Sequence, residues 1–170
     1  YAAKDIYKLI VEHRPCLIFV NTRAQAELLF QALWVHNDLT LKIGLHHGSL
    51  EVGLRRKTEA AMARGELDAV VATSSLDLGI DWADIELVVQ VGAPKGTSRL
   101  LQRIGRAGHR LDAPSRALIV PANRFEVFEA LAAKLNVEQR VLDDLPAHEG
   151  ALDVLAQHIV GRAVAGPFSA

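Results

Sequence analysis

The chain has 170 residues, a formal net charge of −1 and a hydrophobic content of 50%. That length suits one domain with a short extension, and the apolar content allows a sizeable core. The near-neutral charge excludes a global basic field that would attract nucleic acid. The single cysteine, Cys16, excludes a disulfide framework and a cysteine-based zinc cluster. No apolar run reaches the ~20 residues of a membrane span.

Helical and strand-like patterns alternate along the chain. The spacing of apolar residues predicts helices at residues 3–12, 24–35, 51–63 and 124–135, and a further helix that begins near Thr97 or Ser98. Short apolar runs predict strands at residues 17–20, 41–45, 69–72, 86–91 and 117–120. This alternation predicts an α/β fold, a parallel sheet flanked by helices on both faces with right-handed crossovers.

The pattern changes after residue 135. We expect residues 1–135 to form the sheet domain and residues 136–150, which carry Pro146 and scattered acids, to form a linker. Residues 151–164 have apolar side chains at helical spacing, which predicts a C-terminal helical extension. A lone amphipathic helix needs a partner surface, so we expect it to dock on the sheet domain or to be mobile.

Basic residues gather in one segment. Residues 95–116 hold six basic residues and one acid, whereas residues 65–94 hold neither lysine nor arginine. Four arginines recur at spacings of four, three and four, which predicts one shared helix face: Arg99, Arg103, Arg106 and Arg110. Such a stripe is commonly a solvated surface, but the concentration of charge here favours phosphate contacts, which guanidinium groups make in a planar, bidentate way.

Two glycines interrupt the same predicted helix. Each costs ~1 kcal/mol relative to alanine in a helix interior. Gly108 suits a helix C-cap, which would place His109 and Arg110 past the helix end. Gly105 lies further inside, and we interpret it as a close approach of another backbone or of a ligand.

The segments that follow the strands form a second candidate site. In a parallel sheet they meet at one edge, and ligands of α/β folds bind there. Most of them are small or hydroxylated, so backbone N–H groups and hydroxyls are available for phosphate oxygens. Each segment alone is equally typical of turns and helix caps, but the set favours phosphate binding: residues 21–23, 46–49, 73–75, 92–94 and 121–123.

Four stretches stand out along the chain: LIFVNTR (residues 17–23), HHGSL (46–50), ATSSLDLGIDW (72–82) and QRIGRAG (102–108). In order and spacing they resemble the later motifs of superfamily-2 helicases. Over about residues 10–135 the chain resembles the second RecA-like domain of these helicases, and it is most similar to the large-helicase-related (Lhr-type) family, in the branch whose genes sit with a DNA ligase. The resemblance implies a bacterial, cytoplasmic parent that is an ATP-dependent 3′–5′ translocase or helicase on single-stranded or tailed duplex DNA, with a role in DNA repair.

The resemblance also implies roles for individual residues. Arg106 matches the catalytic arginine finger that reaches the γ-phosphate of ATP. Arg103 matches the first arginine of that motif, which we assign to the catalytic and nucleotide contacts, although it is more often a structural or interdomain partner. Gly79 and Asp81 match the segment beside the nucleotide. His109 stands where other helicases have a third arginine, so the second phosphate contact comes from His109, from Arg110 or from neither. The residues that match contacts to the DNA backbone are Asn21, Thr22, Arg23, Gly48, Ser49, Thr73 and Ser74, of which Arg23 also matches a brace for the nucleotide-facing loops.

Two parts of an ATP site are missing from the sequence. There is no GxxxxGK[ST] phosphate loop and no Asp-Glu box after an apolar strand. In the family that the chain resembles, ATP and Mg are held mainly by the preceding RecA-like domain, and a winged-helix domain follows, of which residues 151–164 would be the first helix. We therefore expect this chain, whose first residue is Tyr1, to be a piece of a longer protein and to hydrolyse no ATP alone.

Other interpretations stay open. An RNA helicase would use the same backbone-reading loops, a regulatory nucleotide-binding module would bind ATP tightly by itself, and a protein-interaction fragment would present its arginines to an acidic partner. Asp77 and Asp81 are spaced as an acid–base pair could be. His46 and His47 are adjacent and would point to opposite faces of a strand, so we expect no metal site.

Overall fold

The computed structural model describes residues 2–77, 85–107, 115–143, 150 and 152–166. The helices are α1 (Ala2–Glu12), α2 (Arg23–Val35), α3 (Val52–Ala63), α4 (Thr97–Ile104), α5 (Glu126–Gln139) and α6 (Leu152–Ala165), with a short 3₁₀ helix η1 (Ser74–Leu76). The strands are β1 (Cys16–Phe19), β2 (Ile43–His46), β3 (Ala69–Ala72), β4 (Leu87–Val91) and β5 (Ala117–Val120). Each predicted strand is present, and the bounds of β3 and β5 are those predicted.

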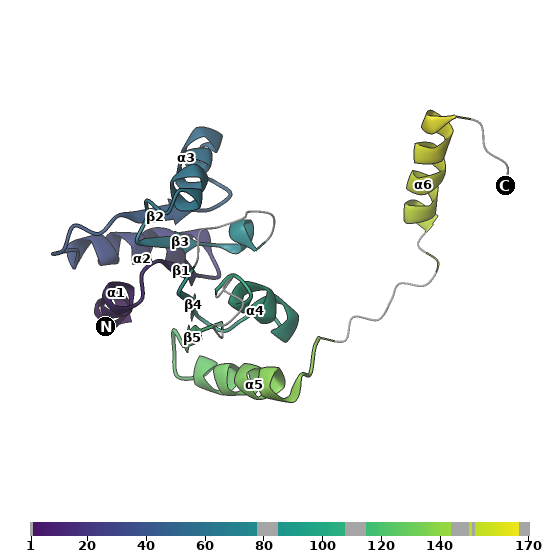
Figure 1. Ribbon diagram of the computed structural model, residues 1–170. Coiled ribbons are helices and arrows are strands. Elements are labelled where there is room, and N and C mark those ends of the chain that lie inside the picture. The colour runs from purple at the N-terminus through teal and green to yellow at the C-terminus, as the bar shows by residue number, and fades with distance from the viewer. Residues whose placement is uncertain (1, 78–84, 108–114, 144–149, 151, 167–170) are drawn as a thin grey trace.

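The five strands form one parallel sheet in the order β2-β3-β1-β4-β5, so β1 lies at the centre (Figure 1). Every residue of β1 and β3 is buried, as expected for strands covered on both faces. Alternate residues of β1 enter two separate cores, because successive side chains of a strand point to opposite faces. Cys16 and Ile18 pack with α1 and α2, and Leu17 and Phe19 pack with α3. The predicted parallel α/β sandwich is confirmed.

Cys16 belongs to the core, as expected. Its side chain is fully buried, and the thiol donates a hydrogen bond to the carbonyl oxygen of His13, with Sγ and O 2.6 Å apart. Burial, and to a lesser degree the charge of Glu86, raise the pKa of the Cys16 thiol to about 12. The residue therefore stays protonated and packs as a small apolar side chain.

The arginine helix is shorter than predicted, and the prediction of one shared helix face is wrong. α4 ends at Ile104 with Gly105 as its C-cap, and the chain continues through turns in which Arg106 and Ala107 donate to the carbonyl oxygens three residues before them, at 3.0 Å each. Ala107 then pairs with Ile85 in an isolated parallel bridge. A Cβ on Gly105 would meet carbonyl oxygens of α4 itself, the nearer at 3.3 Å, so the close approach of another backbone expected there is also wrong.

The segment after β5 also differs from the prediction. α5 continues to Gln139, four residues beyond the expected end, and stops at Arg140, whose φ of 58° is left-handed. The predicted linker cannot start at residue 136, because residues 136–139 are helical. These four residues include no proline or glycine that would end a helix. α6 stands apart from the sheet domain, and its side chains from Leu152 to Ala165 are exposed, so it does not dock there (Figure 1).

Within the described residues, no helix combines the length and the apolar character that crossing a membrane requires.

Candidate functional site

The loops that follow the strands are tied to one another at the carboxyl edge of the sheet. Asn21 Nδ2, after β1, donates to the carbonyl oxygen of Ala93, after β4, at 2.9 Å. Arg23 Nη1 donates to Ser49 Oγ, after β2, at 3.2 Å. These contacts join three strand ends, so the prediction that the segments share one edge is confirmed.

Two local features fix the β1 and β4 loops. Thr22 caps α2 in a capping box, in which its hydroxyl accepts from Gln25 N at 3.2 Å and Gln25 Oε1 accepts from Thr22 N at 3.1 Å. Gly92 has a φ of 85°, and a Cβ there would lie 2.9 Å from Asn21 Nδ2. Only glycine therefore permits the contact between the two loops without strain. The same geometry directs Asn21 toward the protein, whereas Thr22 and Arg23 are exposed.

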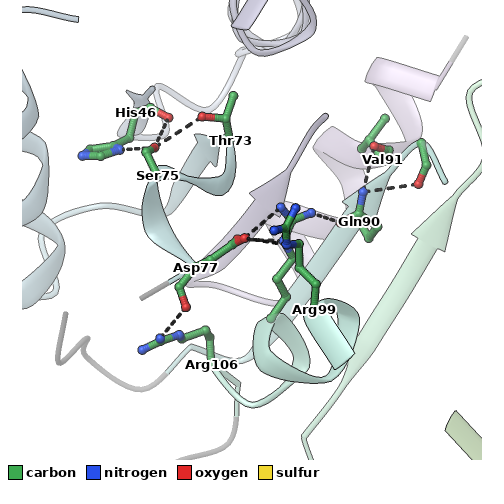
Figure 2. A network of polar contacts seen from close by, with 10 residues as sticks. His46, Thr73, Ser75, Asp77, Gln90, Val91, Arg99 and Arg106 are labelled. Carbon is green, nitrogen blue, oxygen red and sulfur yellow. Dashed lines mark hydrogen bonds and ion pairs between the residues drawn. The ribbon is translucent and has the colours of Figure 1, made fainter. Parts of the chain in front are cut away.

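A chain of polar contacts lies beneath the β3 loop. His46, the last residue of β2, is buried, and its Nδ1 is 2.8 Å from Ser75 Oγ while its Nε2 is 2.8 Å from Glu59 Oε1. Ser75 Oγ is in turn 3.4 Å from Thr73 Oγ1 (Figure 2). Thr73 N also donates to the carbonyl oxygen of His46 at 3.2 Å. The position of Thr73 is therefore set by β2 and α3 as well as by its own strand.

The two adjacent histidines face different helices, as their positions predicted. His46 contacts Glu59 of α3, whereas His47 Nε2 lies 3.3 Å from Glu27 Oε1 of α2. Both imidazoles are buried. In the described part of the chain, no three His, Cys, Asp or Glu side chains gather as a metal site requires.

Asp77 is the centre of the arginine cluster. Its carboxylate accepts two hydrogen bonds from Arg103, from Nε at 2.8 Å and from Nη2 at 3.3 Å. The side chains of Arg103 and Asp77 are only 4% and 9% exposed. Arg103 Nη1 also donates to Gln90 Oε1 at 2.5 Å, and its guanidinium lies over the Phe19 ring, 4.5 Å from the centroid. Arg103 thus has the contacts of an interior brace between β1, β4 and the segment after β3.

Two further arginines meet the same aspartate (Figure 2). Arg99 Nε lies 3.5 Å from Asp77 Oδ2, with 46% of its side chain exposed. Arg106 is half-buried, and its Nη2 donates to the backbone carbonyl oxygen of Asp77 at 2.7 Å. Three of the four predicted arginines therefore converge, although Arg106 reaches Asp77 from beyond the helix end. Asp77 is two residues before Gly79 in the sequence.

The backbone on either side of Arg106 is anchored. Gly105 N donates to the carbonyl oxygen of Leu101 at 2.9 Å, and the carbonyl oxygen of Ala107 accepts from Ser115 Oγ at 2.7 Å. With the Ala107 bridge to Ile85, this fixes where the Arg106 side chain starts. A catalytic side chain must be held in a fixed position relative to the reacting group, and these backbone contacts hold Arg106 in this way.

Several predicted residues lie outside the described residues: Gly79, Asp81, His109 and Arg110. The remaining DNA candidates lie at the carboxyl edge, where Gly48, Ser49 and Ser74 are exposed and Thr73 is half-buried.

Sequence reasoning missed three polar partners. Asp77 was considered only for acid–base chemistry, but its carboxylate is occupied by arginine. Gln90 was missed although a glutamine within the apolar strand Leu87–Val91 needs a buried partner. Glu126 was missed because its role depends on distant loops: its Oε2 accepts from Ala93 N at 3.1 Å and from Ala122 N at 2.8 Å.

Comparison with known proteins identifies the class to which this arrangement belongs. The helicase conserved C-terminal domain family matches residues 2–110. The ATP-dependent helicase Lhr-Core of Methanothermobacter thermautotrophicus is 42% identical over 166 residues, which are 96% of this chain and 19% of that protein. The Lhr helicase/uracil glycosylase of Escherichia coli is 42% identical over 193 residues, covering 96% of this chain and 12% of that protein.

A solved structure, the Mycobacterium smegmatis helicase Lhr bound to ssDNA and AMP-PNP, matches with a TM-score of 0.84 and 35% identity, covering 99% of this chain and 23% of that chain. The chain belongs to the helicase conserved C-terminal domain family, and it corresponds to the C-terminal RecA-like domain of the Lhr-type superfamily-2 helicases. The predicted family and RecA-like fold are confirmed. The chain spans less than a quarter of the length of each of these relatives.

Proposed function

We propose that this chain is the second motor domain of an ATP-dependent 3′–5′ single-stranded DNA translocase or helicase that acts in DNA repair. The observation that carries the proposal is the convergence of Arg99, Arg103 and Arg106 on Asp77 at the loop-bearing edge of the sheet. The relatives support it: the Methanothermobacter protein is an ATP-dependent helicase, and the Mycobacterium smegmatis helicase was solved with ssDNA and AMP-PNP.

The arginines divide the work in this proposal. Arg103 holds Asp77 inside the fold and acts on catalysis indirectly, whereas the half-buried Arg106 is the arginine finger. A guanidinium aimed at the γ-phosphate stabilises charge that develops during phosphoryl transfer. Gly79, Asp81 and His109 complete the nucleotide contacts.

The donor set fits phosphate and does not fit Mg. Arginine side chains and loop N–H groups are phosphate donors, and the Asp77 carboxylate is already bound by Arg103. The preceding RecA-like domain would hold Mg-ATP, which supplies the phosphoryl group. This chain alone then hydrolyses no ATP, and ATP turnover by the purified chain that disappears in Arg106→Ala would contradict this prediction. Tight ATP binding by the purified chain would favour the nucleotide-binding module instead.

DNA would run along the loops after β1, β2 and β3. The candidate contacts are Asn21, Thr22, Arg23, Gly48, Ser49, Thr73 and Ser74. Asn21 contributes less than the others, because its side-chain amide is directed to Ala93. We also propose a cytoplasmic location in bacteria, with a preceding RecA-like domain and a following winged-helix domain as partners. The proposed link to a DNA ligase rests only on the residues that occupy the motifs.

Replacing Thr73 with valine and Ser74 with alanine in the parent helicase should weaken binding of single-stranded DNA by roughly 5- to 30-fold. Two hydroxyl-to-phosphate hydrogen bonds are lost, each contributing about 1 kcal/mol. Fluorescence anisotropy with a labelled oligonucleotide measures the change. Thr40→Ala is the matched control, because Thr40 is an exposed hydroxyl that precedes β2 and so lies at the amino edge of the sheet. Its affinity should equal that of the unchanged parent.

Unchanged DNA affinity in the double variant would remove these loops from the DNA path. The same titration with RNA of identical sequence tests the alternative assignment, since an RNA helicase gains from contacts to the 2′-OH. Tighter binding of RNA than of DNA would favour that alternative.

A further inference from the structure

The N-terminus of α4 is held by a residue 45 to 46 positions later in the chain. The carboxylate of Asp143 accepts from Thr97 N at 3.0 Å and from Ser98 N at 2.9 Å. In return, Asp143 N donates to Ser98 Oγ at 3.3 Å. This reciprocal pattern resembles a capping box, but the carboxylate comes from the segment after α5 instead of from α4.

The helix has no side-chain cap of its own. Its N-cap residue is Gly96, with a φ of 95°, where serine, threonine, aspartate or asparagine is preferred. A Cβ at Gly96 would lie 2.6 Å from Asp143 Oδ2. Gly96 therefore supplies no side chain to cap the helix, and its lack of a Cβ leaves room for the carboxylate of Asp143.

Electrostatics favours the same arrangement. The backbone hydrogen bonds from Ser98 and then Thr97 hold the pKa of Asp143 below its ordinary value. Because the pKa of the folded state is lowered, this contribution is present above the unfolded pKa and is lost as the pH falls through the folded pKa. At neutral pH the carboxylate is charged and faces the positive end of the helix dipole.

The position of the contact connects two parts of the chain. α4 is only eight residues long, carries Arg99 and Arg103, and leads directly to Arg106. So short a helix depends on tertiary contacts to persist. Asp143 lies between α5 and α6, on the connection to the C-terminal extension. A second contact, Asn136 Nδ2 to Thr97 Oγ1 at 3.2 Å, ties α5 to the same helix end.

We propose that Asp143 is a positioning residue that couples the connection to the C-terminal extension with the arginine cluster around Asp77. While the carboxylate binds α4, the helix and Arg106 keep their place. Movement of the extension that withdraws Asp143 frees the N-terminus of α4 and displaces Arg106. The inference rests on the proposed function, because it assigns Arg106 a part in ATP hydrolysis.

The test is steady-state ATP hydrolysis by the full-length parent with saturating single-stranded DNA. Asp143→Ala should lower kcat by about 10- to 100-fold, as small misplacements of catalytic groups do, and leave KM for ATP unchanged. The kcat of Asp143→Asn, which keeps one accepting oxygen, should lie between that of Asp143→Ala and that of the parent. Asp5→Ala, an exposed carboxylate in the first turn of α1, is the matched control and should behave as the parent.

A second variant separates coupling from capping. Ser98→Asp combined with Asp143→Ala returns a carboxylate to the first turn of α4, on the helix itself, and should restore the thermal unfolding midpoint but leave kcat low. Full recovery of kcat would show that capping alone matters and would overturn the proposal, as would an unchanged kcat in Asp143→Ala. If Arg106→Ala also left hydrolysis unchanged, the proposed function itself would fail.

Discussion

Replacing Arg103 with methionine should lower the free energy of unfolding of this chain by about 3–5 kcal/mol, the usual loss when one partner of a buried ion pair is removed. Methionine fills similar space over Phe19, but it leaves the Asp77 carboxylate and the Gln90 amide oxygen without their donor. Urea denaturation followed by circular dichroism measures the change, and the m-value should stay constant.

Arg99→Met is the matched control for this loss. It removes an arginine from the same aspartate, but the Arg99 side chain is 46% exposed and 3.5 Å away, so the change should be under about 1 kcal/mol. A second substitution, Asp77→Leu, should recover part of the stability of Arg103→Met, because it removes a buried charge that has lost its buried partner. Equal losses for Arg99→Met and Arg103→Met would show that burial does not distinguish the two arginines.

Arg106→Ala in the parent helicase should lower kcat for DNA-stimulated ATP hydrolysis by about 10³- to 10⁵-fold, the range found for arginine fingers. Arg106→Lys should stay nearly as slow, because an ammonium group does not reproduce the planar fork of guanidinium. Both variants should remain folded, since Arg106 is half-buried and lies beyond the end of α4, where it donates to the backbone carbonyl oxygen of Asp77.

Arg99→Ala is the control for the rate, as it removes a neighbouring positive charge that the proposal assigns no catalytic part. It should retain kcat within about threefold, because water and salt screen a charge as exposed as that of Arg99. Loss of activity of similar size in Arg99→Ala would show that net charge, and not the placement of Arg106, controls hydrolysis.

Local patterns predicted the sheet well. β3 is buried throughout, and its continuous apolar run is why its predicted bounds hold. The apolar run of β5 also has its predicted bounds, although this edge strand is exposed or half-buried along its length. The shared edge followed from the parallel arrangement alone. The opposite orientations of His46 and His47 followed from the pleat of a strand, and the structure shows their separate partners.

Contacts between distant segments could not be predicted. The Asp77–Arg103 pair spans 26 positions, and no local pattern identifies which carboxylate an arginine meets. α4 was predicted too long because the residues on both sides of Gly105 favour a helix, while the bridge from Ala107 to Ile85 redirects the chain. In the sequence, nothing distinguishes Asp143 from the other acids near it. Its role is visible only in the structure, where the backbone N–H groups of Thr97 and Ser98 donate to its carboxylate.

In the proposed function, Arg106 completes a catalytic centre whose other wall belongs to a neighbouring domain. The most direct test compares the affinities of the parent and of Arg106→Ala, with single-stranded DNA bound, for ADP–aluminium fluoride and for AMP-PNP. ADP–aluminium fluoride mimics the transition state of phosphoryl transfer, whereas AMP-PNP mimics the bound substrate. Because the proposed role of Arg106 is in the transition state, the affinity of Arg106→Ala for ADP–aluminium fluoride should fall by about 100-fold or more. Its affinity for AMP-PNP should change by less than about threefold. Equal changes for both ligands, or no change for either, would contradict the account.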